Sequence, residues 1–429
     1  MIIEFSFGNF RSFKDIQSLN MTAAKIKSEN KKLDVNNLIT FDEKLSLLKS
    51  KAIYGANASG KSNVIGALFS YIKIVKNCVK DEKVLNLIDN FQLSTETENK
   101  PAFFQMIFIH DSIRYRYGFE ATKEEIKSEW LYGTPAIREV PFFIREGNSI
   151  IKINKKYFNE GYKLRSLFDS KDEDNGVFRR NSLFLSAVAA LNGKQAKSIL
   201  DSISSIILIS GLGYEGVMYQ VAIDALDDNS KKEKIFDFLK LADMGIDEIG
   251  TFELSKEKIS DDVPNKGIKP EKIVVTKHSK YNSNMQKIGK ALFSFPFSES
   301  EGTKKMFEIS PFILEAITKG RTIVIDEFDA RFHPLITKKI VEIFNSKTNK
   351  YSQLIFVTHD TNLLSADLLR RDQIDFVEKD MYGASHLYTL VQFKGIRKTS
   401  FQNDYIRGKY GAIPFIGDFN HIFNTDKDA

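Results

Sequence analysis

The chain has 429 residues with a formal net charge of +6 at pH 7, and 42% of its residues are hydrophobic. That length leaves room for two or three packing units around a large core. The single cysteine, Cys78, excludes an internal disulfide and a thiolate metal cluster, and we expect it to be buried in a protein of a reducing cytosol. No run of about 18 apolar residues and no signal-peptide pattern is present, so we expect a cytoplasmic protein without a membrane partner.

The small positive excess permits contact with nucleic acid but does not require it. Lys and Arg number 62 against 56 Asp and Glu, and no basic tail is present. We therefore favour a solvated surface over a DNA-binding one, while DNA stays open as a partner.

The first predicted elements lead to a P-loop. Alternating apolar and polar residues at 2–7 predict a strand that runs into Asn9-Phe-Arg-Ser-Phe13. A polar stretch, 22–50, leads to a short apolar run and then to Gly55-Ala-Asn-Ala-Ser-Gly-Lys-Ser62, a P-loop pattern. Apolar residues at helical spacing follow from 64 to 72, so a helix that packs on a sheet begins at this loop.

The P-loop predicts a nucleotide site. Its backbone N–H groups face an anion, and the following helix adds the positive end of its dipole. Lys61 is expected to reach the β- and γ-phosphates of ATP, and Ser62 to bind Mg²⁺. Asn57, Gly60 and Asn63 complete the predicted nucleotide-binding set.

An antiparallel sheet is predicted next. Two runs rich in aromatic and β-branched residues, 103–109 and 113–119, flank a short polar turn and predict a hairpin, which 126–132 and 140–144 extend. Arg114 and Arg116 alternate with tyrosines along it. This alternation suggests a nucleic-acid face, but we favour a hairpin with one wet and one buried face.

The middle of the chain predicts mostly helix at 181–209 and at 231–244. Between about 252 and 290 it becomes polar and rich in Lys, with Pro264 and Pro270 as breakers. His278 has no partner at metal-ligand spacing, so we interpret it as a surface residue.

A second candidate anion site follows. The loop Phe297-Ser-Glu-Ser-Glu-Gly-Thr303 precedes an apolar-patterned helix at 306–317. Ser300, Gly302 and Thr303 bring two hydroxyls and an unhindered backbone to a helix N-terminus, which can bind an anion. The loop can equally be an N-cap alone, and both interpretations stay open.

Residues 321–327, Arg-Thr-Ile-Val-Ile-Asp-Glu, predict a buried parallel strand that ends in two carboxylates. Ligands bind at the carboxyl edge of such sheets. Asp326 is expected to hold Mg²⁺, and Glu327 to act as the general base for the attacking water. A purely structural pair would need a counter-charge, which the metal ion supplies.

Asp329 follows at once, then a helix at 335–344 and a second buried strand at 353–357. This strand ends in Thr358-His359-Asp360. A lone histidine is usually a satisfied core residue. At the same sheet edge as Asp326, however, His359 is better interpreted as a donor to the γ-phosphate.

Taken in order, these motifs resemble the nucleotide site of ABC-type ATPases: Walker A at 55–62, the signature loop at 300–303, Walker B at 323–327, the D-loop Asp329 and the H-loop His359. Residues 9–13 are similar to the first strand of the SMC/RecF/OLD-like branch. More narrowly, residues 299–305, 371–374, 378–380 and 408–414 resemble the prokaryotic AAA family ATPases of abortive-infection and phage-defence systems, of the RloA, AbiL and AriA type.

The resemblance implies a head-to-head homodimer, or a higher homo-oligomer, that holds each ATP between Walker A of one subunit and the signature loop of the other. By this analogy Ser300, Gly302 and Thr303 act in trans. Asp329 crosses the interface and Arg11 approaches the nucleotide. The signature carries Glu301 where transporters have glycine, and the Mg-binding glutamine is unplaced, with Gln92 and residues 181–182 as candidates.

The predicted fold is α/β: an ABC-type P-loop ATPase head with a mixed or parallel sheet, an antiparallel β subdomain and a mainly helical insertion. The predicted domains are 1–120, the N-terminal lobe with Walker A; 121–290, the helical insertion; and 291–429, the C-terminal lobe with the remaining motifs.

The implied function is an Mg²⁺-dependent ATPase that acts as a dimeric switch in antiviral defence, senses infection and controls a separately encoded effector, a nuclease or toxin. The alternative is a DNA-binding SMC/RecF-like ATPase of DNA repair or DNA-end processing, against which the missing coiled-coil arms count. A third reading gives the chain its own nuclease, but Glu378 and Asp380 are a poor substitute for a Toprim acidic cluster.

Overall fold

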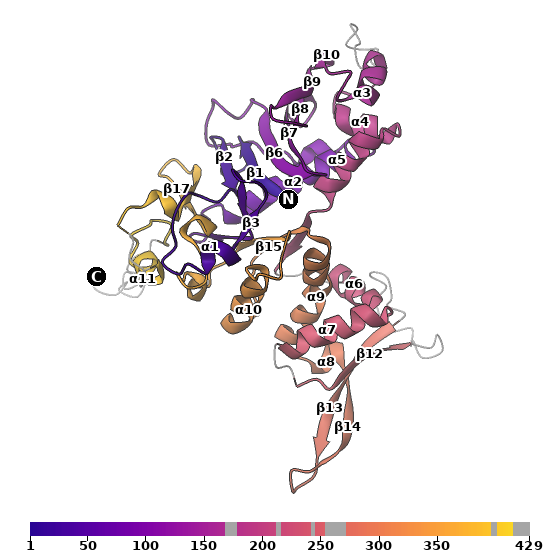
Figure 1. Ribbon diagram of the computed structural model, residues 1–429, viewed down its shortest axis with the longest axis vertical. Helices are drawn as coiled ribbons and strands as arrows, with labels where there is room; N and C mark the ends of the chain where they lie inside the picture. Colours follow the sequence, from indigo (N-terminus) through magenta and orange to yellow (C-terminus); the bar gives the residue numbers. More distant parts are fainter. Residues whose placement is uncertain (168–177, 212–215, 242–244, 254–271, 396–400, 415–429) are drawn as a thin grey trace, which may run out of the picture.

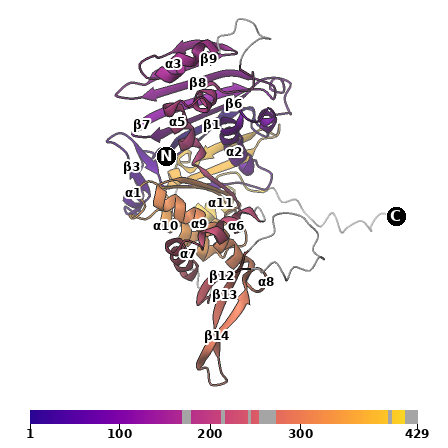
Figure 2. The ribbon, with the colours of Figure 1, turned by 90° about the vertical axis from the view of Figure 1, so that its right-hand side faces the viewer.

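The computed structural model describes residues 1–167, 178–211, 216–241, 245–253, 272–395 and 401–414. The molecule is elongated (Figure 1; Figure 2). An antiparallel sheet lies at one end, a largely parallel sheet in the middle, and a projecting hairpin at the other end.

The strands are β1 (Ile2–Gly8), β2 (Gln17–Asn20), β3 (Leu38–Thr40), β4 (Ser46–Leu48), β5 (Ser50–Tyr54), β6 (Ala102–His110), β7 (Ile113–Ala121), β8 (Ile126–Thr134), β9 (Val140–Glu146), β10 (Ser149–Ile153), β11 (Ile207–Ser210), β12 (Glu248–Glu253), β13 (Lys272–Tyr281), β14 (Lys287–Ser294), β15 (Thr322–Asp326), β16 (Gln353–Val357), β17 (Ile374–Lys379) and β18 (Ser385–Thr389). The α-helices are α1 (Leu33–Asn36), α2 (Lys61–Asn77), α3 (Asn159–Leu164), α4 (Phe184–Ala190), α5 (Lys194–Ser204), α6 (Val217–Ala225), α7 (Asn229–Leu241), α8 (Phe295–Ser298), α9 (Glu301–Lys319), α10 (Pro334–Phe344) and α11 (Phe401–Ile406).

The seven-stranded sheet has the order β10-β9-β8-β7-β6-β1-β2, and its neighbours pair antiparallel. The predicted first strand, the hairpin and both extending strands are confirmed. Asp111 and Ser112 both have positive φ, as a two-residue hairpin turn requires. Tyr115 and Tyr117 are buried, which confirms one buried face. The expected domain boundary at residue 120 falls inside β7, in the middle of this sheet.

The six-stranded sheet has the order β11-β15-β16-β5-β17-β18. Its strands run parallel from β11 to β17, and β18 adds an antiparallel edge. Both faces are covered, because Val324 of β15 packs into one hydrophobic core while Ile323 and Ile325 pack into the other. This burial on both faces is the reason that the strand reads as a continuous apolar run.

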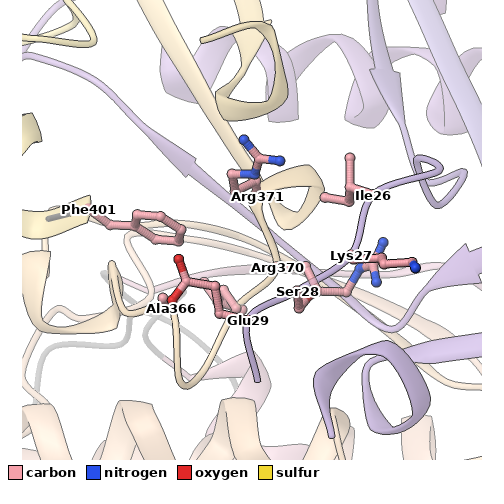
Figure 3. A pocket seen from close by; sticks show the side chains of 9 residues that line it. Ile26, Lys27, Ser28, Glu29, Ala366, Arg370, Arg371 and Phe401 are labelled. Carbon is pink, nitrogen blue, oxygen red and sulfur yellow. The ribbon is translucent and has the colours of Figure 1, made fainter. Parts of the chain in front are cut away.

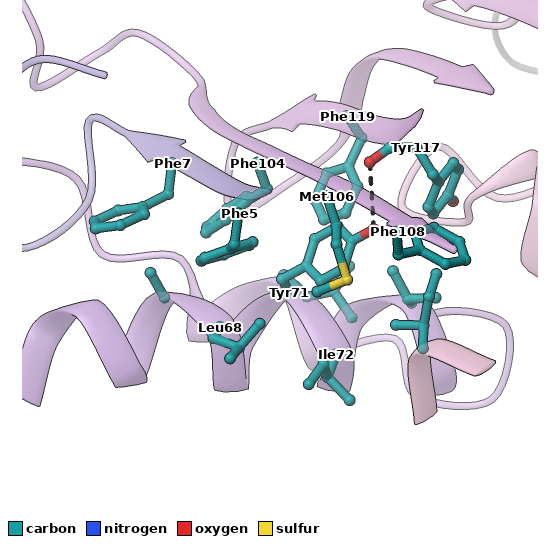
Figure 4. Close-up of a cluster of buried hydrophobic side chains, with 14 of the residues drawn as sticks. Phe5, Phe7, Leu68, Tyr71, Ile72, Phe104, Met106, Phe108, Tyr117 and Phe119 are labelled. Atoms are coloured by element: carbon teal, nitrogen blue, oxygen red, sulfur yellow. Dashed lines mark hydrogen bonds between the residues drawn. The ribbon is translucent and has the colours of Figure 1, made fainter. Parts of the chain in front are cut away.

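Helix α2 lies between the two sheets. Leu68, Tyr71 and Ile72 point from α2 into the aromatic face of β1, β6 and β7 (Figure 4). The Tyr71 ring stacks on Phe119 with centroids 5.7 Å apart, and its hydroxyl donates to the Tyr117 carbonyl over 3.3 Å. Val324 of the parallel sheet belongs to the same core. The helix that follows the P-loop is therefore fixed from both sides.

Helices α6, α7, α9, α10 and α11 contribute to the second core, on the other face of the parallel sheet. The longest of them, α9, begins at an N-cap in which the Ser300 hydroxyl accepts from the Thr303 N–H, and ends at Gly320 with φ 64°. Pro311 inside α9 cannot donate to the Phe307 carbonyl. The Ser310 hydroxyl donates to that carbonyl over 2.8 Å, so the proline leaves it satisfied.

One prediction for the middle of the chain was wrong. Residues 207–209 form strand β11 and not helix, because this short apolar run pairs with β15. The polar, Lys-rich region holds the end of β12, all of β13 and the start of β14, while residues 254–271, with both predicted breakers, lie outside the described residues. His278 is half-buried, and its Nε2 lies 2.7 Å from Glu299 Oε1. The helix expected at 231–244 is confirmed up to Leu241, and residues 242–244 lie outside the described part.

Cys78 is buried at the end of α2, as expected, and burial raises the pKa of its thiol to about 11. None of the described helices combines the length and the apolar character that a membrane span needs.

A buried carboxylate joins the antiparallel sheet to α4. Glu129 on β8 is fully buried and accepts from the Tyr117 hydroxyl over 2.9 Å and from the Phe184 N–H over 2.6 Å. Arg145, opposite it on β9, lies 3.4 Å away. Burial raises the pKa of Glu129, whereas Arg145 opposes that rise. Glu129 therefore stabilises the fold only with these partners in place.

Replacing Glu129 by Ala leaves buried Arg145 without its carboxylate, so we expect the free energy of unfolding to fall by about 3–5 kcal/mol. Urea denaturation followed by circular dichroism measures the change. Glu146→Ala, at an exposed position on β9, is the control and should stay within about 0.5 kcal/mol of the wild type. Equal stability of the two variants would contradict the proposed role of the pair.

Candidate functional site

The predicted site residues meet at one edge of the parallel sheet. Strand β16 pairs on one side with β5 and on the other with β15, in parallel and in register, with Ile53 opposite Val357 and Ile325 opposite Phe356. Parallel strands present their carboxyl ends at the same edge. The P-loop after β5, His359 after β16 and Asp326 at the end of β15 therefore share that edge.

The P-loop is supported by two serines from distant parts of the chain. Gly60 has φ 111°, and a Cβ there would lie 2.5 Å from Ser385 Oγ and 2.7 Å from Ser12 Oγ. Ser385 Oγ donates to the Ser59 carbonyl over 2.6 Å, and Asn63 Nδ2 donates to Ser12 Oγ over 2.8 Å. Glycine is thus required at Gly60 both by its backbone angle and by this contact. The Ser59 hydroxyl oxygen is buried and has no protein partner among the described residues.

The Lys61 amine lies inside the loop. It donates to the carbonyls of Gly55 over 2.8 Å and Ala56 over 2.7 Å. Burial lowers the pKa of Lys61, and nearby Glu327 and Asp326 oppose that shift. A partly desolvated lysine near two carboxylates is suited to a site that binds an anion together with a metal ion.

Ser62 and Asp326 provide the predicted metal ligands. The Ser62 hydroxyl donates to Asp326 Oδ1 over 3.3 Å, which brings Walker A and Walker B together. Within the described residues no group of three or more His, Cys, Asp or Glu side chains could hold a metal ion. One hydroxyl and one carboxylate form a donor set that fits Mg²⁺, which takes few protein ligands and completes its shell with phosphate oxygens and water.

Glu327 has a strained backbone with φ 52°. Its N–H donates to Asp326 Oδ1 over 3.1 Å, and the Gly211 N–H donates to the Asp326 carbonyl over 2.6 Å. A Cβ on Gly211 would lie 1.9 Å from the Glu327 carbonyl oxygen. Strained residues of this kind concentrate at functional sites. Sequence reasoning missed Gly211, although an apolar run that ends in glycine was the available pattern.

Asp329 holds the end of β16 in its own chain. Its Oδ1 accepts from the Thr358 hydroxyl over 2.6 Å and from the His359 N–H over 3.1 Å. The predicted crossing of Asp329 to a second subunit is thus not needed to satisfy this carboxylate. The His359 side chain is exposed at the strand end, so it is not a satisfied core histidine.

The signature loop begins α9. Ser300 and Gly302 are accessible at the helix start, whereas Thr303 is buried and its hydroxyl lies 2.8 Å from Ser300 Oγ. Of the three residues predicted to act in trans, Thr303 is thus buried against the N-cap Ser300, to which its N–H donates. Ser300 and Gly302 are the two that a second chain can reach.

Arg11 lies beside the first turns of α2. Its N–H donates to the Asp89 carbonyl over 2.6 Å, and with Asn63 and Gln92 it lines an open pocket of about 520 Å³. This pocket is next to the P-loop through Asn63. Residues 181 and 182, the other candidates for the position of the Mg-binding glutamine, do not line this pocket. Asn181 donates to the Glu82 carbonyl, and Ser182 donates to the Cys78 carbonyl.

A separate small cavity of about 130 Å³ lies between the segment that contains Ile26 and Glu29 and the one that contains Arg371 (Figure 3). Arg371 begins the 3₁₀ turn (Arg371–Gln373) that leads into β17, and β17 is parallel to β5. The cavity is therefore at the amino edge of the sheet, opposite the P-loop, and does not belong to the predicted site.

The P-loop, the parallel order β15-β16-β5 and the covering antiparallel sheet define an ABC-type ATPase head. A family model described as "AAA domain, putative AbiEii toxin, Type IV TA system" matches residues 52–365. Because this match spans more than half of the chain, the protein belongs to that AAA family. No curated protein matches the sequence.

Solved structures that are similar include the SMC head domain from Thermotoga maritima, with 13% identity over 90% of this chain and 98% of that chain and a TM-score of 0.40. The SmcHead bound to the C-winged helix domain of ScpA has 13% identity over 90% and 97%, with a TM-score of 0.41. An Smc head domain with an extended coiled coil bound to the C-terminal domain of ScpA, derived from Pyrococcus furiosus, has 14% identity over 95% and 99%, with a TM-score of 0.39.

Gly211→Ala is expected to displace the backbone of Asp326 and Glu327, because the new methyl group meets a carbonyl oxygen. Displacing these two carboxylates from their positions should lower ATP turnover about 100-fold. Turnover is measured by phosphate release with Mg²⁺ present. Gly289→Ala, where a Cβ has open space, is the matched control and should turn over ATP like the wild type. An active Gly211→Ala variant would show that this contact does not position Walker B.

Proposed function

We propose that this protein is an Mg²⁺-dependent ATPase that closes into a dimer on ATP and acts as a switch in antiviral defence. The observation that carries the proposal is the gathering of Lys61, Ser62, Asp326, Glu327 and His359 at one sheet edge.

ATP binding replaces contacts within the loop. The Lys61 amine exchanges the carbonyls of Gly55 and Ala56 for β- and γ-phosphate oxygens, which are stronger acceptors for a charged donor. Ser62 and Asp326 would hold Mg²⁺, which would supply positive charge to neutralise the phosphates. The buried Ser59 hydroxyl and the Arg11 side chain lie in loops that would line the nucleotide.

Hydrolysis uses the ends of two neighbouring strands. Glu327 accepts a proton from the attacking water, and His359 donates a hydrogen bond to the γ-phosphate. Asp329 accepts from the backbone N–H of His359, so the backbone that carries this donor is held before ATP arrives. Preorganised donors of this kind are the main source of catalysis in phosphoryl transfer.

The dimer supplies the remaining contacts. Ser300 and Gly302, accessible at the start of α9, bind the γ-phosphate held by a second subunit. ATP then stabilises only the closed state, and hydrolysis shifts the population toward the open state.

The defence role rests on the family. Its description names a toxin of a toxin–antitoxin system, which is compatible with a switch that controls a separately encoded effector, a nuclease or toxin. Infection is the input that we propose for this switch.

Glu327→Gln tests the proposal, since the amide cannot take the proton from water. We expect kcat to fall about 100-fold or more while ATP binding persists and closed dimers accumulate. Phosphate release, fluorescent-nucleotide titration and analytical ultracentrifugation measure the three effects. Glu342→Gln, on the surface of α10, is the control and should leave all three unchanged.

Wild-type turnover by Glu327→Gln would remove that residue from the base role. Turnover that rises with duplex DNA, and loses this rise steeply as salt is added, would instead support the DNA-bound ATPase.

A further inference from the structure

The signature helix is joined to the segment after Walker B by a buried lysine. Lys305 is 7% exposed, although its position one turn into α9 could face solvent. Its Nζ donates to the Ala330 carbonyl, lies 3.5 Å from the Phe328 carbonyl, and sits 4.4 Å from the centroid of the Phe332 ring.

Two further contacts join the same segments. Arg331 pairs with Glu301 over 3.0 Å, and a Cβ on Gly302 would lie 3.1 Å from the Arg331 carbonyl oxygen. Glu301, which stands where the signature of transporters has glycine, thus pairs with Arg331 of its own chain. The start of α9 and residues 328–332 therefore meet at three points.

Residues 327–330 are also tied to the chain's own site. The Ala330 N–H donates to the Glu327 carbonyl over 3.1 Å, and the Phe328 N–H donates to the Val357 carbonyl over 2.9 Å. Asp329 accepts from the His359 N–H. One short segment thus touches the signature helix on one side and the predicted catalytic residues on the other.

We propose that Lys305 is a positioning residue that couples the two halves of the composite site, so that engagement of Ser300 by a partner's nucleotide and placement of Glu327 on the chain's own nucleotide change together. This inference rests on the proposed function. Lys305 acts through the backbone of residues 328–330 and touches no nucleotide.

A lysine buried at this position lowers the stability of the fold, so we infer that Lys305 serves through the hydrogen bonds that it donates. Burial lowers the pKa of Lys305 to about 8, while Asp329 opposes that shift. A buried charge is weak evidence for stability. An ammonium group, however, carries several donors and can serve two carbonyls at once, which an apolar side chain of the same length cannot.

Lys305→Met tests the coupling, because methionine still packs against Phe332 but offers no donor. We expect kcat to fall about tenfold or more, with the Kd for a fluorescent ATP analogue within twofold of the wild type. Lys305→Arg, which keeps the charge and donors, should retain at least a third of wild-type kcat. Lys319→Met, an exposed lysine on the same helix, is the matched control.

In the Glu327→Gln background, Lys305→Met should still form ATP-dependent dimers by ultracentrifugation, since Ser300 itself is unchanged. Wild-type kcat in Lys305→Met, with an active wild-type enzyme, overturns the coupling and leaves the proposed function standing. Equal losses of ATP affinity and thermal stability in both Lys305 variants also overturn it, because they indicate a structural role alone. An inactive wild-type enzyme overturns the proposed function and this inference together.

Discussion

The parallel pairing of β16 with β5 and with β15 is the constraint on which the site depends. Each strand delivers one part of the chemistry at its carboxyl end, and the registers Ile53 with Val357 and Ile325 with Phe356 bring those ends level. Residues 264 positions apart in sequence thereby come within hydrogen-bond reach, as the contact of Ser62 with Asp326 shows. The sheet is buried on both faces, so a one-residue slip of register would exchange the side chains that enter the two cores and disrupt the packing of both.

The antiparallel sheet serves the same site from the other side. It packs on α2, and α2 begins at the P-loop, so the aromatic core around Tyr71 holds the loop in place. The loop also rests on Ser12 and Ser385, which bond to each other over 2.8 Å. A nucleotide site that must bind a large anion tightly benefits from such support, because the loop loses little further freedom on binding.

The contacts between α9 and residues 328–332 connect the loop that would contact a partner's ATP with the residues that would contact the chain's own ATP. Glu301, Gly302 and Lys305 all face that segment, although they belong to the loop expected to contact a second subunit. In the proposed dimer, a connection of this kind would carry a movement at one nucleotide through packed backbone to the other.

The sequence by itself determined the P-loop, the carboxylate pair Asp326 and Glu327, and the elements with strong local periodicity, because those depend on spacing within a few residues. Only the tertiary structure decided that 207–210 is a strand, since its pairing with β15 overrides a helical pattern. Ser385 and Lys305 likewise carry no local pattern, and the apolar run that ends in Gly211 does not by itself reveal what that glycine contacts. Their roles arise from contacts with distant backbone, and the free energy of such contacts depends on a fold that no short stretch of sequence encodes.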